Sequence, residues 1–140
     1  KVVLIASAKN KSELPKNYFI GWMLKLINII PASFFTRPNF IAYWYFGVKT
    51  AFEKQLLKDI LKDTDPEFFN WAIHEIIHWE NQASPVNCIH IHGNKDRIIP
   101  IRNINADFVI RGGGHFMTVN KSEEISKILQ EICAGNAQNS

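Results

Sequence analysis

Two residues with acid–base side chains lie in glycine-containing loops in the second half of the chain. Asp96 occurs in the string GNKDRIIP at 93–100, and His115 occurs in the string RGGGHF at 111–116. A carboxylate beside an imidazole holds one tautomer of the ring and stabilises the imidazolium that forms when the ring takes a proton. Taken singly, Asp96 would be a turn aspartate and His115 a loop histidine. As a pair, they could be the acid and the base of nucleophilic catalysis.

A second string, His74-Glu75-Ile76-Ile77-His78, matches the helical pattern of zinc proteases, in which two histidines one turn apart bind the metal. Ser84 stands where the longer form of the pattern needs a third histidine. Helical projection puts both histidines and Glu67 on a polar face. The opposite, apolar face comprises Phe68, Phe69, Ala72, Ile73, Ile76, Ile77 and Trp79. We therefore expect an amphipathic surface helix here, with no metal site and no cofactor.

Most of the Phe, Trp and Tyr residues lie between Tyr18 and Trp79. Among them, the cluster Tyr43-Trp44-Tyr45-Phe46 could form the core of the cap or the wall of a substrate site, and we favour a core that also supplies part of the wall. The predicted substrate contacts are Trp22, Tyr43, Trp44 and Phe116.

The composition excludes several classes of protein. The 140 residues are 46% hydrophobic and 21% charged, which excludes a disordered chain and allows one domain or part of one. The formal net charge of +3 is too small to indicate nucleic-acid binding, and no apolar run is long enough to span a bilayer. Two cysteines are too few for a disulfide framework. We therefore expect a cytoplasmic protein without nucleic-acid or membrane partners.

Three segments, at 1–7, 86–92 and 107–111, are typical of strands buried on both faces because their apolar runs are continuous rather than alternating. Asp65 is the expected N-cap of one helix and Asn120 that of the last helix. Helical periodicity predicts helices at about 16–30, 37–47, 49–62, 66–81 and 121–133.

The order of these elements predicts an α/β fold with a short parallel sheet and a helical cap. The predicted units are a sheet core at 1–9 and 83–134, a cap at 10–82 and a disordered tail at 135–140. Asp96 and His115 each follow the carboxyl end of a strand, and open α/β sheets have their sites at that edge. We therefore expect the two side chains to lie within hydrogen-bond reach of each other.

With this layout the chain resembles the C-terminal half of an α/β-hydrolase superfamily protein. Residues 2–6 resemble the strand after the nucleophile-bearing helix, and residues 10–82 resemble the cap. Residues 88–96 resemble the acid-bearing strand and loop, and residues 108–116 the strand that leads to the histidine. Residues 121–132 resemble the closing helix. The resemblance implies a partial α/β-hydrolase fold. It also implies that Asp96 orients His115, which would serve as general base and then as general acid.

Two features depart from the family pattern. His115 follows Asp96 by only 19 positions, so the helix usual between their strands is reduced to a turn near 100–105. No Gly-x-Ser-x-Gly elbow is present, so the nucleophilic serine and the oxyanion hole are expected upstream of Lys1. The chain would then be a fragment whose partners are a small-molecule substrate and the missing N-terminal half. The exposed edge of strand 1–7 could also lead to self-association.

These interpretations favour a serine-dependent, esterase-like hydrolase that acts on small, partly apolar substrates through a nucleophile outside the 140 residues. Dehalogenase and epoxide-hydrolase chemistry stay open without the nucleophile. The chain alone would be inactive. The alternative is a non-catalytic α/β binding module whose aromatic helices contact a partner, in which Asp96 and His115 would be a turn and a loop residue only.

Overall fold

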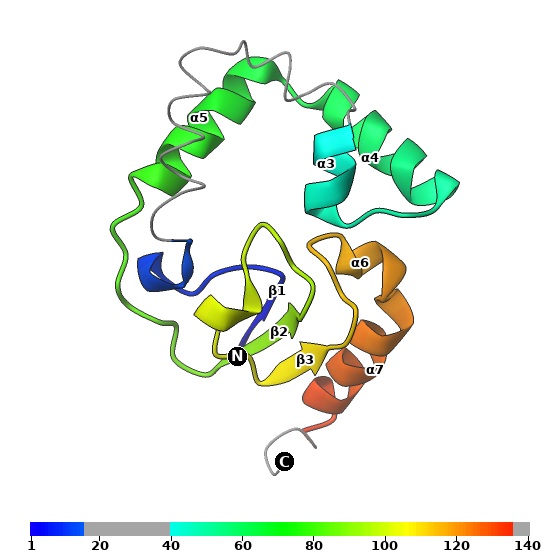
Figure 1. Ribbon diagram of the computed structural model, residues 1–140. Helices are drawn as coiled ribbons and strands as arrows, with labels where there is room; N and C mark the ends of the chain where they lie inside the picture. The colour runs from blue at the N-terminus through cyan, green and yellow to red at the C-terminus, as the bar shows by residue number, and fades with distance from the viewer. Residues whose placement is uncertain (16–39, 136–140) are drawn as a thin grey trace.

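Three parallel strands form one sheet in the computed structural model, which describes residues 1–15 and 40–135 (Figure 1). The strands are β1 (Val2–Ile5), β2 (Cys88–Gly93) and β3 (Phe108–Ile110), and β2 lies between the other two. Both strand pairs are parallel, so the predicted α/β fold with a short parallel sheet is confirmed.

The helical elements of the described ranges follow the predicted order. They are η1 (Lys11–Glu13), α3 (Phe40–Phe46), α4 (Ala51–Asp63), α5 (Pro66–Ile77), η2 (Ile101–Asn103), α6 (Met117–Asn120) and α7 (Ser122–Cys133). The 3-10 turn η2 falls where a helix reduced to a turn was expected between β2 and β3. The predicted helix at 16–30 and residues 136–140 of the predicted tail lie outside the described residues. No helix in the described ranges combines the length and the apolarity needed to cross a membrane.

The start of the last helix differs from the prediction. Asn120 is the final residue of the short helix α6 rather than the N-cap of α7. Lys121 occupies the N-cap position of α7, and its side chain makes no capping hydrogen bond. The cause is the fully buried Met117, whose N–H donates to the Gly114 carbonyl at 3.1 Å. The chain therefore turns helically directly after the glycine-rich loop, one turn earlier than predicted.

Side-chain caps define where α4 and α5 begin. Asp65 Oδ1 accepts hydrogen bonds from two backbone N–H groups of the first turn of α5, at 2.8 and 2.9 Å, which confirms the predicted N-cap. Thr50 and Glu53 form a capping box at the start of α4. Burial alone would raise the pKa of Glu53, but hydrogen bonds from the N–H groups of Lys49 and Thr50 outweigh it and lower the pKa.

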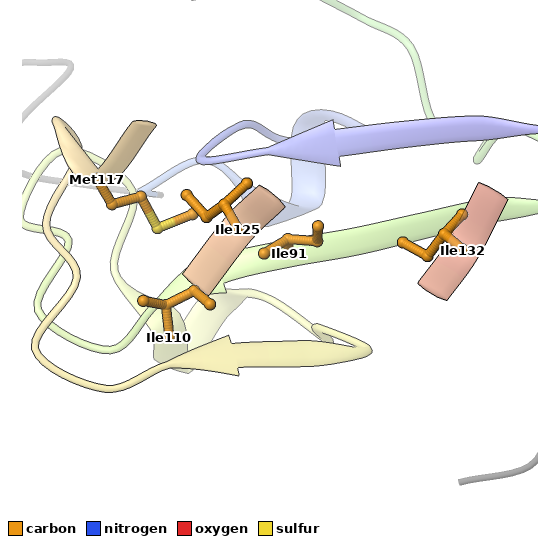
Figure 2. Close-up of a cluster of buried hydrophobic side chains, with 5 residues drawn as sticks. All are labelled: Ile91, Ile110, Met117, Ile125 and Ile132. Atoms are coloured by element: carbon orange, nitrogen blue, oxygen red, sulfur yellow. The ribbon is translucent and has the colours of Figure 1, made fainter. Parts of the chain in front are cut away.

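Helix α7 covers one face of the sheet through an apolar core (Figure 2). The buried members of this core are Ile91, Ile110, Met117, Ile125 and Ile132. A second buried cluster joins α4 and the α3–α4 turn to the segment after β3, and it comprises Val48, Leu57, Leu61 and Phe116. Because the adjacent residues Phe116 and Met117 enter different clusters, the segment that follows His115 is held between the sheet core and the cap helices.

The two outer strands and α5 are less buried than their apolar sequences predict. Val2 of β1 is 40% exposed and Val109 of β3 is 50% exposed, because each strand has one strand neighbour in the described sheet. The predicted apolar face of α5 is also only partly covered, since Phe68 and Ile76 are exposed. In Figure 1, α5 lies apart from the sheet rather than against one of its faces. The expectation of strands buried on both faces is therefore wrong for β1 and β3.

The two ends of the predicted cap, 10–82, lie side by side. The Lys11 N–H donates to the Asn81 carbonyl at 2.8 Å, and the Asn10 side-chain amide donates to Ser84 Oγ at 3.0 Å. The segment between them therefore leaves the sheet region and returns to it at one place, which is the geometry of an insertion.

The face of β2 opposite the α7 core carries histidines. His90 and His92 point to this face because side chains alternate along a strand, and both are fully buried. Their Nε2 atoms lie 2.9 Å from the Ser7 carbonyl oxygen and 2.8 Å from the Ile99 carbonyl oxygen, respectively. The loops that follow β1 and β2 therefore cover this face, and each is tied to β2 by one imidazole.

We predict that the folded chain loses stability on acidification in part through His90. Burial lowers the pKa of His90 below its ordinary value of 6.5, so the unfolded chain binds the proton more readily. The contribution of His90 is therefore complete above about pH 6.5 and is lost as the pH falls toward the lower folded-state pKa. Urea unfolding at about pH 7.5 and about pH 5 measures this loss.

The variant His90→Gln keeps a hydrogen-bond donor and removes the titration, so its unfolding free energy should fall less between the two pH values than that of the wild type. The control His74→Gln replaces an exposed histidine in the same way, so it shows whether the loss of an imidazole elsewhere has the same effect. Equal pH dependence in His90→Gln and the wild type would contradict the prediction.

Candidate functional site

Asp96 and His115 are in direct contact, as their placement after consecutive strands predicts. His115 Nδ1 lies 2.9 Å from Asp96 Oδ2. The Asp96 side chain is fully buried, whereas that of His115 is 26% exposed. A carboxylate can only accept, so we assign the proton to Nδ1. This leaves the lone pair of Nε2 on the partly exposed ring as the available base.

Local hydrogen bonds fix the orientation of the Asp96 carboxylate. Its Oδ1 accepts from the N–H groups of Ile98 and Ile99 at 2.8 and 2.9 Å. This turn geometry is typical of aspartate that bonds to the backbone two and three residues on. Because Oδ1 is held by its own loop, Oδ2 is left to face His115. The two oxygens of one carboxylate therefore have separate partners.

Backbone contacts bring the loop of the acid against the loop of the histidine. The Asn94 N–H donates to the Ile110 carbonyl at 3.1 Å, and the Lys95 N–H donates to the Gly113 carbonyl at 2.8 Å. A Cβ atom on Gly93 would lie 2.3 Å from the Gly113 carbonyl oxygen, so no larger residue fits at position 93 without a shift of the backbone. The pair depends on this close approach.

Helix α3 contacts both loops of the site. The Phe46 carbonyl accepts from the Phe116 N–H at 3.2 Å, and the Phe46 ring meets the His115 ring edge-on with 5.8 Å between centroids. On the acid side, Arg97 Nη1 donates to the Trp44 carbonyl at 2.6 Å, and its guanidinium lies 4.4 Å from the centroid of the Trp44 ring. The end of α3 therefore links the cap to both members of the pair.

The predicted substrate contacts have different positions. Trp22 lies outside the described residues. Phe116 is buried in the second cluster and Tyr43 packs against it, so both pack into the junction between cap and core. Trp44 is 48% exposed and lies beside the acid loop through Arg97. The substrate-binding role of these residues stays a prediction.

Sequence reasoning did not single out Arg97, and it included Phe46 in the aromatic cluster at 43–46 without predicting its contact with His115. Arg97 could have been noticed because it follows Asp96 directly. Phe46 carries no comparable signal, since its contact with His115 joins segments that are far apart in the chain. Such contacts follow from packing and not from local spacing.

The histidines of the zinc-protease string lie on an exposed face of α5 and its end, as the helical projection predicts. The His74 and His78 rings stack with 4.0 Å between centroids, and His74 Nδ1 is 3.5 Å from a Glu75 oxygen. Within residues 1–15 and 40–135, no group of three or more His, Cys, Asp or Glu side chains is arranged to hold a metal ion. Cys88 is half-buried on β2, Cys133 is exposed on α7, and both thiols are free.

Neither models of protein families nor curated proteins match this chain. The geometry therefore defines the site: a parallel α/β sheet whose carboxyl edge carries a buried carboxylate bonded to a partly exposed imidazole.

We predict that Gly93→Ala loosens the two loops of the pair. The added Cβ must push back the Gly113 carbonyl, and overpacking of this kind costs about 1–3 kcal/mol in the free energy of unfolding. Gly112→Ala is the comparison: its Cβ would meet nothing within 4 Å, so it costs the strain of alanine at φ +74°, about 1–2 kcal/mol, without a collision with backbone atoms. Urea unfolding of both variants should therefore find Gly93→Ala the less stable. A smaller loss at Gly93 than at Gly112 would count against the close approach of the loops.

Proposed function

We propose that this chain supplies the acid and the general base of a hydrolytic site, and that it is related to the α/β-hydrolase superfamily that its sequence resembles. The single observation that carries the proposal is the 2.9 Å contact between Asp96 Oδ2 and His115 Nδ1 at the carboxyl edge of a parallel sheet. A buried carboxylate in contact with a more exposed imidazole is the arrangement that a general base needs.

The chemistry follows from the two ring nitrogens. His115 Nε2 would take the proton of a serine hydroxyl as the serine oxygen attacks the carbonyl carbon of an ester. The ring then carries a positive charge, which the Asp96 carboxylate at Nδ1 stabilises. When the ester C–O bond breaks, Nε2 gives its proton to the departing alkoxide. Water repeats the cycle on the acyl-enzyme, with His115 again as the base.

We assign the nucleophile to a serine outside these 140 residues. None of the serines that the structure describes, Ser7, Ser12, Ser84, Ser122 and Ser126, hydrogen-bonds to His115, although Ser7 follows the carboxyl end of β1. Ser12 Oγ donates to the Asn10 side chain at 2.6 Å, and Ser84 Oγ accepts from the same side chain at 3.0 Å. Ser122 and Ser126 belong to α7, which covers a face of the sheet rather than its carboxyl edge. The chain alone would then lack both the nucleophile and the oxyanion hole.

The edge of β1 is where we expect the segment that carries the nucleophile to join. The N–H groups of Val2 and Ala6 donate to carbonyls at Asn87 and Ile91, so alternate residues of β1 face β2. The backbone groups of Val3 and Ile5 face the other way, and β2 is the one strand neighbour of β1 in the described sheet. An added strand would satisfy these groups. Pairing of two copies through the same edge is the competing outcome.

The surroundings of His115 favour a small, partly apolar substrate. The ring is edge-on to Phe46, and the half-exposed Trp44 lies on the acid side. Which ester, or which related bond, is cleaved depends on the nucleophile and its pocket.

Both cysteines are free thiols, which suits the reducing conditions of a cytoplasmic location.

A non-catalytic binding module remains the second candidate, and one observation favours it. Large apolar side chains on the cap helices are exposed, among them Phe52 on α4 and Phe68 and Trp71 on α5. Exposed aromatic residues of this kind are common at protein interfaces. The hydrolase requires His115 as its general base, whereas in the binding module His115 would be a loop residue only.

The test is a protein extended by the coding sequence upstream of Lys1. We expect a serine in that extension to react with a fluorophosphonate probe, whereas the 140-residue chain should not react. Ester turnover by the extended protein should fall about 10⁴-fold in Asp96→Asn and about 10⁶-fold in His115→Ala. His74→Ala, on the exposed face of α5, is the control with unchanged turnover. Absence of both probe labelling and ester turnover in the extended wild type would favour the binding module, whereas turnover that survives His115→Ala would contradict the role of His115 as the base.

A further inference from the structure

A second buried imidazole lies beside the carboxylate of Asp96. His92 Nε2 is 3.6 Å from Asp96 Oδ2, and both side chains are fully buried. The same nitrogen is 2.8 Å from the Ile99 carbonyl oxygen. The acid therefore lies between two histidines, and the mechanism above gives a role to His115 alone.

The hydrogen bonds connect His92 to the acid loop in a closed ring. A carbonyl oxygen can only accept, so His92 Nε2 carries the proton. Its Nδ1 has no hydrogen-bond partner in the described part of the chain, so a proton there would be buried without an acceptor. Ile99 in turn donates its N–H to Asp96 Oδ1 at 2.9 Å. One residue of the loop is thus held at its carbonyl by His92 and at its N–H by Asp96.

We propose that His92 is a positioning residue for the acid–histidine pair. It anchors the loop whose N–H groups hold Oδ1, and its Nε2–H dipole lies near Oδ2. Rotation of the carboxylate away from His115 would break the bonds to Ile98 and Ile99. Without His92, the buried Ile99 carbonyl loses its partner and the loop can shift, so Oδ2 no longer faces Nδ1. The catalytic meaning of this role rests on the proposed function, but its test reads the His115 ring and not turnover.

The same strand offers a matched control. His90 is also fully buried, and its ring centroid is 5.3 Å from that of His92 on the same face of β2. Its Nε2 is likewise close to a carbonyl oxygen, that of Ser7 at 2.9 Å. This carbonyl belongs to the loop after β1 and not to the acid loop. His90→Leu therefore removes an equivalent donor without touching the contacts of Asp96.

The experiment follows the ring nitrogens of His115 by NMR in the ¹⁵N-labelled 140-residue chain at about neutral pH. The chain has five histidines, and His115→Gln identifies the signals of this ring. The wild type should have the His115 proton on Nδ1, protected from exchange with water by Asp96. In His92→Leu, this proton should exchange about fivefold faster or more, the factor equivalent to one hydrogen bond. The tautomer signal should also move toward a mixture of the two forms.

Two further variants separate positioning from general destabilisation. His92→Gln can present an amide N–H near the former Nε2 and should restore the His115 signature, whereas the shorter His92→Asn should not. His90→Leu should leave the signature unchanged even where it lowers stability. An unchanged His115 ring in His92→Asn, or an equal change in His90→Leu, would overturn the proposal. A wild-type signature together with no probe-reactive serine in the extended protein would instead refute the hydrolase and leave the role of His92 intact.

Discussion

The contact between the turn after β2 and the glycine-rich loop after β3 is the constraint on which the candidate site depends. Gly93 lies so close to the Gly113 carbonyl that a methyl group would collide with it. The Lys95–Gly113 hydrogen bond then joins the two loops directly through their backbones. Parallel pairing brings both strand ends to one edge, but it does not by itself bring two side chains within 3 Å. Because the residues at this contact are glycines, the two loops can approach closely enough for Asp96 and His115 to form a hydrogen bond.

The two faces of β2 carry different side chains. The apolar face stabilises the packing of α7, and the face with the histidines holds the loops in position. The face under α7 is apolar and includes Ile91. The other face is closed by loops that His90 and His92 hold through carbonyl oxygens. An apolar contact is tolerant of direction, whereas a hydrogen bond fixes distance and angle. A loop that must hold a carboxylate in one orientation therefore benefits from an imidazole anchor beneath it.

The cap is attached to the sheet region at two places, where its chain ends meet and at helix α3. Helix α3 also bonds to the loop of the histidine through the Phe46 carbonyl and to the loop of the acid through Arg97. The buried cluster around Phe116 and Leu57 adds apolar contact at the same junction. A movement of α3 relative to the sheet would therefore disturb the surroundings of His115. Cap position and the geometry of the pair are linked through one short helix.

The sequence by itself determined the element types, the parallel sheet and the pairing of Asp96 with His115. These follow from short-range signals: continuous apolar runs, the Asp65 cap, and polar residues placed just after strand ends. It did not determine the exposure of β1, β3 and α5, since burial depends on which neighbours a segment has. It also did not reveal α6, because the burial of Met117 decides where the chain turns. The contacts of Phe46 with His115 and of Arg97 with Trp44 were likewise decided by tertiary structure, because they join residues that are far apart in the chain. The approach of His92 to Asp96 was decided by how the loop after β2 folds back on the strand.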